Sequence, residues 1–325
     1  MLPLSCRPIV RPVPRLAVSL DSSWILKAPQ KGEAETPPLG THGNPETSMN
    51  RKRPASDDFA SGVAAGTLLR NIRIVVAYDG TGFHGWQRQP SLPTVQACLE
   101  EVIAQVTGEP VKLFGSGRTD AGVHALGQVA NFASSCRIPL PNLIKAVNRV
   151  LPPEVRVRQA GEVAAGFRAR YDVRSKTYRY RILQAEVCSP FLWRFVWHYP
   201  HALDRRRMAA AARSFIGTHD FTSFAASGPS EDDSPKHETA DPASMTRTVF
   251  SSKILWSAKT QTLVYEVRGG GFLHHMVRNL TGTLVEVGRG KLRTDDVIRI
   301  LKARNRSLAG PTAPAQGLCL LRVEY

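Results

Sequence analysis

The sequence predicts an α+β fold made of two ferredoxin-like halves, whose antiparallel sheets flank a basic central cleft. Strand and helix patterns follow one another in the order β-α-β-β-α-β from residue 71 to about residue 170, and a second set of strands and helices comes after them. Lys and Arg together outnumber Asp and Glu by 43 to 27. We therefore expect an extension at 1–70, an N-terminal domain at 71–170 and a C-terminal domain at 171–325.

The first 70 residues are rich in Pro, Ser, Thr and Gly and show neither helical nor strand periodicity. Such a segment cannot offset its ordering entropy by burial, so it is predicted to be a disordered extension. Met49 inside it is an alternative start of the natural protein. Prolines break every apolar run of the first 20 residues, which does not fit a secretory signal, while a transit peptide stays open.

In the first half, apolar residues alternate from Ile72 to Val76 and predict a strand that ends at an Asp79-Gly80 turn. Apolar residues spaced along one face predict a helix from about Thr94 to Val106. The same criteria predict the other elements of this half, which are strands at 111–115, 128–133 and 155–163 and a helix at 143–150.

In the second half, the same patterns predict strands at 175–183, 196–199, 248–256, 262–268 and 318–325, with helices at 204–216, 272–287 and 294–303. A polar segment at 228–245 interrupts them and carries a net charge of −4. A polyanion would repel this segment, so we expect it to form a loop that lies off the path of a nucleic acid.

The charge balance points to nucleic acid as the leading partner class. The net charge is +16 and the pI is about 10.1, with 32 Arg against 11 Lys. Arg presents a planar fork of donors to phosphate oxygens, although a merely well-solvated basic surface has the same composition. No apolar run approaches the roughly 20 residues of a membrane span, and five widely spaced cysteines without a C-x-x-C pair indicate a reducing, cytoplasmic compartment.

The most informative stretch is Gly115–His124, GSGRTDAGVH, which joins two predicted strands. Arg118 and Asp120 fall on one face if this stretch is extended, so a guanidinium and a carboxylate can meet there. Taken alone, Asp120 also fits a turn in which its side chain bonds its own backbone. The glycine spacing does not match a dinucleotide-binding fingerprint.

Residues Ser116–Gln128 resemble the signature of the TruA-type tRNA pseudouridine synthases. Further stretches resemble that family's other motifs in the same order, namely Tyr78–Gln89, Phe167–Tyr171 with Lys176–Tyr180, Asp220–Phe224 and Gly271–Asn279. The resemblance spans about residues 72–325. It implies an isomerase that converts uridine to pseudouridine in the anticodon stem-loop of tRNA, typically at positions 38 to 40. It also implies a homodimer without metal or organic cofactor.

The resemblance also assigns the principal site residues. Asp120 falls on the family's catalytic aspartate, which attacks the ribose or removes a sugar proton. Arg278 is expected to pair with it, because an adjacent opposite charge favours the ionised carboxylate. Arg118 would take the space of the extruded uridine or hold its phosphate. Tyr178 would offer a flat surface to the uracil ring and take part in proton removal at C5.

Four more residues are candidate RNA contacts, each of which fits an ordinary surface position equally well: Arg88, Arg168, Arg170 and His275. Adjacent side chains point apart in a regular helix or strand, so His274 and His275 are not expected to form a metal site. Three alternatives stay open from sequence, namely a catalytically inactive tRNA-binding relative, a synthase acting on another RNA, and a glycosylase that releases free uracil.

Overall fold

The computed structural model describes residues 69–226 and 245–325. The predicted disordered extension and the predicted acidic loop therefore lie outside the described residues, except at their last one or two positions. The α+β class is confirmed. The helices of the described part are α1 (Val95–Thr107), α2 (Leu140–Val150), α3 (Arg205–Arg213), α4 (Met276–Gly288) and α5 (Asp296–Ala303).

The strands of the described part are β1 (Arg70–Tyr78), β2 (Phe114–Gly115), β3 (His124–Ser134), β4 (Val155–Val163), β5 (Ser175–Leu183), β6 (Trp197–His198), β7 (Gly217–Asp220), β8 (Thr246–Ser257), β9 (Thr262–Gly269) and β10 (Leu318–Glu324). They form one ten-stranded sheet with the order β4-β1-β3-β10-β5-β9-β8-β7, in which β2 pairs with β3 and β6 with β5. The sheets of the two predicted halves are thus continuous.

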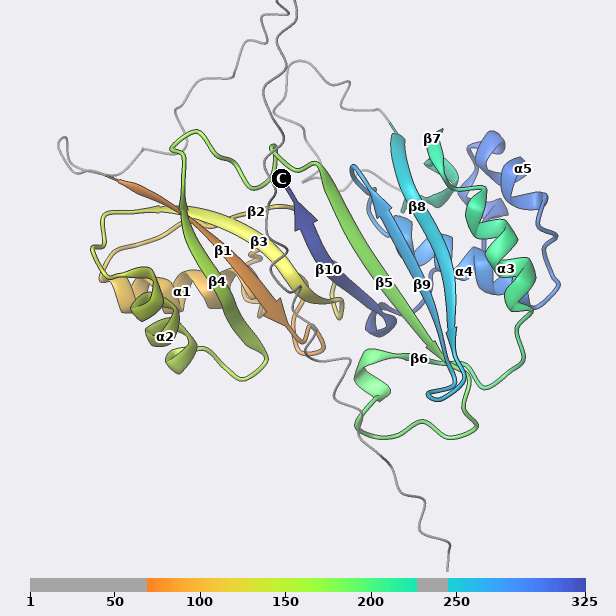
Figure 1. Ribbon diagram of the computed structural model, residues 1–325, viewed down its shortest axis with the longest axis horizontal. Helices are drawn as coiled ribbons and strands as arrows, with labels where there is room; N and C mark the ends of the chain where they lie inside the picture. Colours follow the sequence, from red (N-terminus) through yellow and green to blue (C-terminus); the bar gives the residue numbers. More distant parts are fainter. Residues whose placement is uncertain (1–68, 227–244) are drawn as a thin grey trace, which may run out of the picture. The chain divides into compact units, whose positions relative to one another are not determined.

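Strand β10 is the element that joins them (Figure 1). It runs parallel to β3, with Cys319 opposite His124, and antiparallel to β5, with Leu320 opposite Tyr178. Because the last strand of the chain lies between strands from both halves, the sheet cannot be divided without breaking its ladder.

The core of the first half follows from the predicted alternation. Ile72, Ile74 and Val76 of β1 are buried at 0–2% exposure, and the side chains between them face the other way. Helix α1 begins at Thr94, whose hydroxyl caps Ala97 N–H, and ends at Gly108 in the left-handed conformation that glycine adopts without strain. Helices α1 and α2 lie beside this part of the sheet, whereas α3 and α4 lie beside the strands of the second half and α5 lies near β7 (Figure 1).

The largest differences from the sequence prediction concern four elements. The strand expected at 111–115 is only the two residues of β2, and the strand expected at 128–133 begins earlier, at His124, where β10 supplies a partner. The helix expected from Phe272 begins at Met276, because His275 has a φ of 59°, outside the helical region. Strand β7 was not predicted, because its four residues are too few for a recognisable alternation.

Two glycines let the segment before β10 pack directly on α4. A Cβ added to Gly282 would lie 1.7 Å from the carbonyl oxygen of Pro311, and one added to Gly310 would lie 2.7 Å from Thr283 Cα. Backbone therefore touches backbone at this point, and residues 309–314 are held against α4. No helix within 69–226 or 245–325 combines the length and the apolar character needed to cross a bilayer.

We expect Gly282→Ala to lower the free energy of unfolding by about 1–3 kcal/mol, as overpacking does. An alanine in a helix interior would otherwise stabilise by about 1 kcal/mol, so the steric effect has to exceed that gain. Denaturant unfolding measures the difference. Gly161→Ala is the control, because a Cβ there meets nothing within 4 Å; equal stability of both variants would contradict the close packing.

Candidate active site

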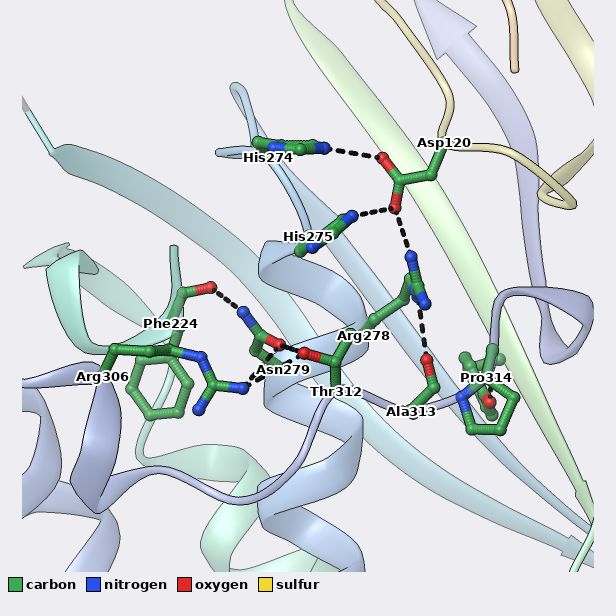
Figure 2. A network of polar contacts seen from close by, with 11 residues as sticks. Asp120, Phe224, His274, His275, Arg278, Asn279, Arg306, Thr312, Ala313 and Pro314 are labelled. Atoms are coloured by element: carbon green, nitrogen blue, oxygen red, sulfur yellow. Dashed lines mark hydrogen bonds and ion pairs between the residues drawn. The ribbon is translucent and has the colours of Figure 1, made fainter. Parts of the chain in front are cut away.

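The Asp120 carboxylate is the centre of the site (Figure 2). Arg278 Nη1 donates to its Oδ2 at 2.9 Å. The Nε2 atom of His275 lies 3.5 Å from the same oxygen, and that of His274 lies 3.6 Å from Oδ1. The Asp120 side chain is 19% exposed. The carboxylate is therefore held from one side and still open to a substrate.

The loop that carries Asp120, residues 116–123, is fixed by the segment that follows β1. Trp86 N–H donates to Thr119 O at 3.0 Å and Gly122 N–H donates to Phe83 O at 3.3 Å. A Cβ at Gly85, whose φ is +86°, would lie 2.5 Å from Thr119 O. Only glycine fits both this conformation and this close approach. Two motifs that are separate in the sequence thus form one rigid unit.

The base of the same loop is closed by polar side chains. Ser116 Oγ donates to Gln128 Oε1 at 2.6 Å, and Gln128 Nε2 donates to Gly117 O at 2.9 Å. Both side chains are buried, so each of these hydrogen bonds also satisfies a polar group that water cannot reach. The Asp120 carboxylate consequently projects from a loop with little freedom to move.

Arg278 comes from the first turn of α4, 158 residues further along the chain. Its Nε donates to Ala313 O at 2.8 Å while its Nη1 faces Asp120. The guanidinium is therefore fixed at both ends, and its side chain is only 15% exposed. The Arg278–Asp120 ion pair expected from the sequence is therefore present.

The two histidines correct the sequence analysis. They were expected to point apart, but their rings lie against each other with centroids 3.9 Å apart and planes tilted by 38°, and both face Asp120. The physical reason is the left-handed backbone at His275 (φ 59°), which turns the chain just before α4. Ligand atoms of Asp120, His274 and His275 all lie within 4.8 Å of one another, so a spacing suited to a metal ion does exist here.

The charge state of His275 follows from its surroundings. Burial lowers its pKa below the ordinary histidine value, the Asp120 charge opposes this shift, and electrostatic repulsion from His274 and Arg278 adds to it. The net direction is downward, so His275 is neutral near pH 7. A neutral imidazole can donate one hydrogen bond toward the carboxylate, and Arg278 supplies the full positive charge of the site.

Tyr178 lies on β5 near the carboxylate. Its ring packs edge-on against Phe272, with centroids 5.2 Å apart, and 8% of the residue is exposed. Burial raises the pKa of its hydroxyl, and the nearby Asp120 charge raises it further, so the phenol stays protonated. Tyr180 shares this face of β5, as the alternation predicted, and its hydroxyl donates to Pro314 O at 2.6 Å.

The remaining predicted residues are four arginines, one in the loop that carries Asp120 and three elsewhere in the first half. Arg118 is exposed, two positions before Asp120. Arg88 is paired with Glu100 of α1 at 2.7 Å, which partly neutralises it. Arg170 is exposed, and Arg168 is partly buried with its guanidinium 6.0 Å from the Tyr171 ring centroid. The sequence-based roles of these four arginines stay predictions.

Sequence reasoning missed Lys176, which connects β5 to the loop that carries Asp120. Its Nζ donates to Ser116 O at 2.8 Å, and a Cβ at Gly117 would lie 2.4 Å from that nitrogen. Burial, together with the positive charges of Arg170 and Arg247, lowers the pKa of Lys176 to about 8. The signal that could have revealed it is the period of two on a strand, which puts Lys176 on the same face as Tyr178.

With this geometry established, the comparison with protein families gives a clear result. The model of the family described as tRNA pseudouridine synthase matches residues 74–172 and 211–325 of this chain. These ranges contain Asp120, both histidines and Arg278, whereas Tyr178 lies between them. The chain belongs to the tRNA pseudouridine synthase family, a family of isomerases.

Individual relatives agree with that assignment. A tRNA pseudouridine synthase A of Solibacter usitatus is 52% identical over 79% of this chain and 100% of its own length. Proteins of the same name in Acetivibrio thermocellus and Thermoanaerobacter sp. are 42% and 44% identical, again over 79% of this chain and all of theirs. A chain from the crystal structure of a Cbf5-Nop10-Gar1 complex aligns with a TM-score of 0.25, at 13% identity over 76% of this chain and 57% of that one, which is too low a similarity to support an argument.

The lowered pKa of Lys176 predicts a specific pH dependence of stability. Between about pH 8 and pH 10.5 the unfolded chain binds a proton at Lys176 that the folded chain has lost. The free energy of unfolding must therefore rise with pH across this window. We expect the wild type to gain stability there relative to Lys176→Met. Denaturant unfolding at both ends of the window measures this gain. Lys253→Met is the control, because it removes an exposed lysine and should gain the same stability with pH as the wild type.

Proposed function

We propose that this chain converts uridine to pseudouridine in tRNA, at positions 38 to 40 of the anticodon stem-loop. The observation that supports it most directly is the partly exposed Asp120 carboxylate, held by Arg278 in a loop that matches the family signature. The proposal includes a homodimer in the cytoplasm and two ferredoxin-like halves with a basic cleft between them. The strand order β4-β1-β3, with β2 paired to β3, supports a ferredoxin-like arrangement of the first half.

The reaction breaks the bond from C1′ to N1 of uracil and forms a bond from C1′ to C5. Asp120 acts on the ribose while the base is detached, either by attacking C1′ or by removing a sugar proton. The detached uracil rotates and re-attaches through C5, after which C5 loses a proton and N1 carries one. The atoms of substrate and product are the same, so no co-reactant is required.

One carboxylate is sufficient for this chemistry, because water does not take part. A glycoside hydrolase needs a second carboxylate to activate water or to protonate the leaving group. Among the described residues, the groups beside Asp120 are instead a guanidinium and two imidazoles. They supply positive charge and hydrogen-bond donors in place of a second carboxyl group, which supports isomerisation over hydrolysis by a pair of carboxylates.

The other site residues have roles that their positions support. Tyr178 offers its ring to the uracil, and its protonated hydroxyl can pass the C5 proton onward but cannot take it as a phenolate. Arg118 occupies the space left by the extruded uridine or holds its phosphate. Arg88, Arg168 and Arg170 contact phosphates, and the net charge of +16 provides most of the affinity for tRNA.

We expect Asp120→Asn and Asp120→Ala to abolish pseudouridine formation and to leave the dissociation constant for tRNA within several-fold of wild type, because phosphate contacts dominate binding. Release of the C5 hydrogen from isotopically labelled tRNA measures turnover, and free uracil is assayed in parallel. Asp204→Asn is the control, because Asp204 caps α3 and Asn caps helices equally well. Measurable turnover by Asp120→Asn would remove Asp120 from this role.

We expect Tyr178→Phe to bind tRNA like the wild type and to turn over at least roughly 100-fold more slowly, as when a proton-transfer group is lost. The ring surface remains, so affinity should not change. Tyr265→Phe is the matched control, because Tyr265 is another buried tyrosine, with its hydroxyl 3.0 Å from Ser252. Full activity of Tyr178→Phe would reduce Tyr178 to a surface for stacking.

A further inference from the structure

A second polar network lies directly behind the Arg278–Asp120 pair (Figure 2). Its centre is Asn279, the residue after Arg278 on α4, which is fully buried. Asn279 Oδ1 accepts from Thr312 Oγ1 at 2.6 Å and from Arg306 Nη2 at 3.1 Å, while its Nδ2 donates to Phe224 O at 2.8 Å. One buried amide thus joins α4, the segment after α5 and the end of the 3-10 helix at Thr222–Phe224.

Arg306 extends this network along the segment 309–314. Its Nη1 donates to Gly310 O at 2.9 Å, and its Nη2 donates to Thr312 Oγ1 at 3.2 Å. Gly310 N–H in turn donates to Thr283 Oγ1 of α4 at 2.9 Å. A planar guanidinium with several fixed donors suits such a task, since it holds carbonyls and a hydroxyl in one plane.

The segment 309–314 includes Ala313, whose carbonyl oxygen orients Arg278. Ala313 O accepts from Arg278 Nε at 2.8 Å, and Ala313 N–H donates to Arg278 O at 3.2 Å. Pro314 O is held from the sheet by Tyr180. The position of Ala313 O therefore depends on Thr312 immediately before it and Pro314 immediately after it.

We propose that Asn279, Arg306 and Thr312 are positioning residues, which hold Ala313 O so that the Arg278 guanidinium presents Nη1 to Asp120 in the reactive orientation. They lie on the other side of Arg278 from Asp120 (Figure 2). Their effect passes through the Nε–H of Arg278. The inference rests on the proposed pseudouridine synthase activity, which is measured first on the wild-type chain.

The experiment compares single-turnover rates and tRNA dissociation constants of Thr312→Val and Arg306→Ala. Valine keeps the shape of threonine and removes only the hydroxyl that bonds Asn279. We expect both variants to react about 10- to 100-fold more slowly, which is the size of effect that a small misplacement of reacting groups produces. Their affinity for tRNA should stay within several-fold of wild type.

The matched control is Arg156→Ala. Arg156 also holds a loop by its Nη1, which donates to Val155 O at 2.6 Å and Leu151 O at 3.3 Å, but it lies in β4 and has no contact with Arg278. Thermal unfolding of all variants compares their stability. If Arg156→Ala loses as much stability as Arg306→Ala but reacts at the wild-type rate, the slower reaction of Arg306→Ala is due to positioning and not to lower stability.

The same substitutions are then made in an Arg278→Lys background. Lysine keeps the positive charge and lacks the Nε–H that Ala313 O accepts, so the further loss of rate should shrink to about twofold or less. Wild-type rates for Thr312→Val and Arg306→Ala would overturn the inference. So would equal losses in both backgrounds, or a loss confined to tRNA affinity. A wild-type chain that forms no pseudouridine would instead overturn the proposed function.

Discussion

The placement of β10 between β3 and β5 is the constraint on which the rest of the site depends. The loop that carries Asp120, residues 116–123, ends where β3 begins, at His124. His124 pairs with Cys319 of β10. The next residue, Leu320, pairs with Tyr178 of β5. Two consecutive residues of one strand therefore fix the separation between the loop that carries Asp120 and the strand that carries Tyr178.

Glycine contacts allow β10 to come close enough for this. A Cβ at Gly127 of β3 would lie 2.5 Å from Leu321 O, and one at Gly317 would lie 2.5 Å from the Tyr180 ring. The segment before β10 is held in the same way on α4 by Gly282 and Gly310. The last part of the chain thus connects the three sources of the site, because it pairs with β3 and β5 and packs on the helix that supplies Arg278.

The electrostatics of the site follow from this arrangement. A partly buried carboxylate is destabilised unless charged or hydrogen-bonding partners surround it. Arg278 supplies the charge, His275 approaches the same carboxylate oxygen, and His274 approaches the other one. Lys176 adds a partly buried ammonium at the start of the loop, where its Nζ donates to Ser116 O. Positively charged and hydrogen-bonding groups therefore surround Asp120 and the start of its loop.

Much of this could be read from the sequence alone. Periodicity gave β1, α1, β4 and β5 to within one or two residues, because their apolar spacing reflects local geometry and one buried face. The signature around Asp120 indicated the catalytic loop, and the late motif indicated Arg278 as its partner. These features depend on residue type and short-range spacing, which a single sequence contains.

Only the tertiary structure decided the joining of the sheet by β10, the contact between the His274 and His275 rings and the network from Asn279 to Ala313. The first depends on pairing between strands that are about 140 to 200 residues apart, which periodicity does not encode. The second depends on one left-handed residue, His275, although histidine gives no strong signal for that conformation. The third depends on hydrogen bonds between residues on different elements, whose identity is set by how the backbone packs and not by any spacing along the chain.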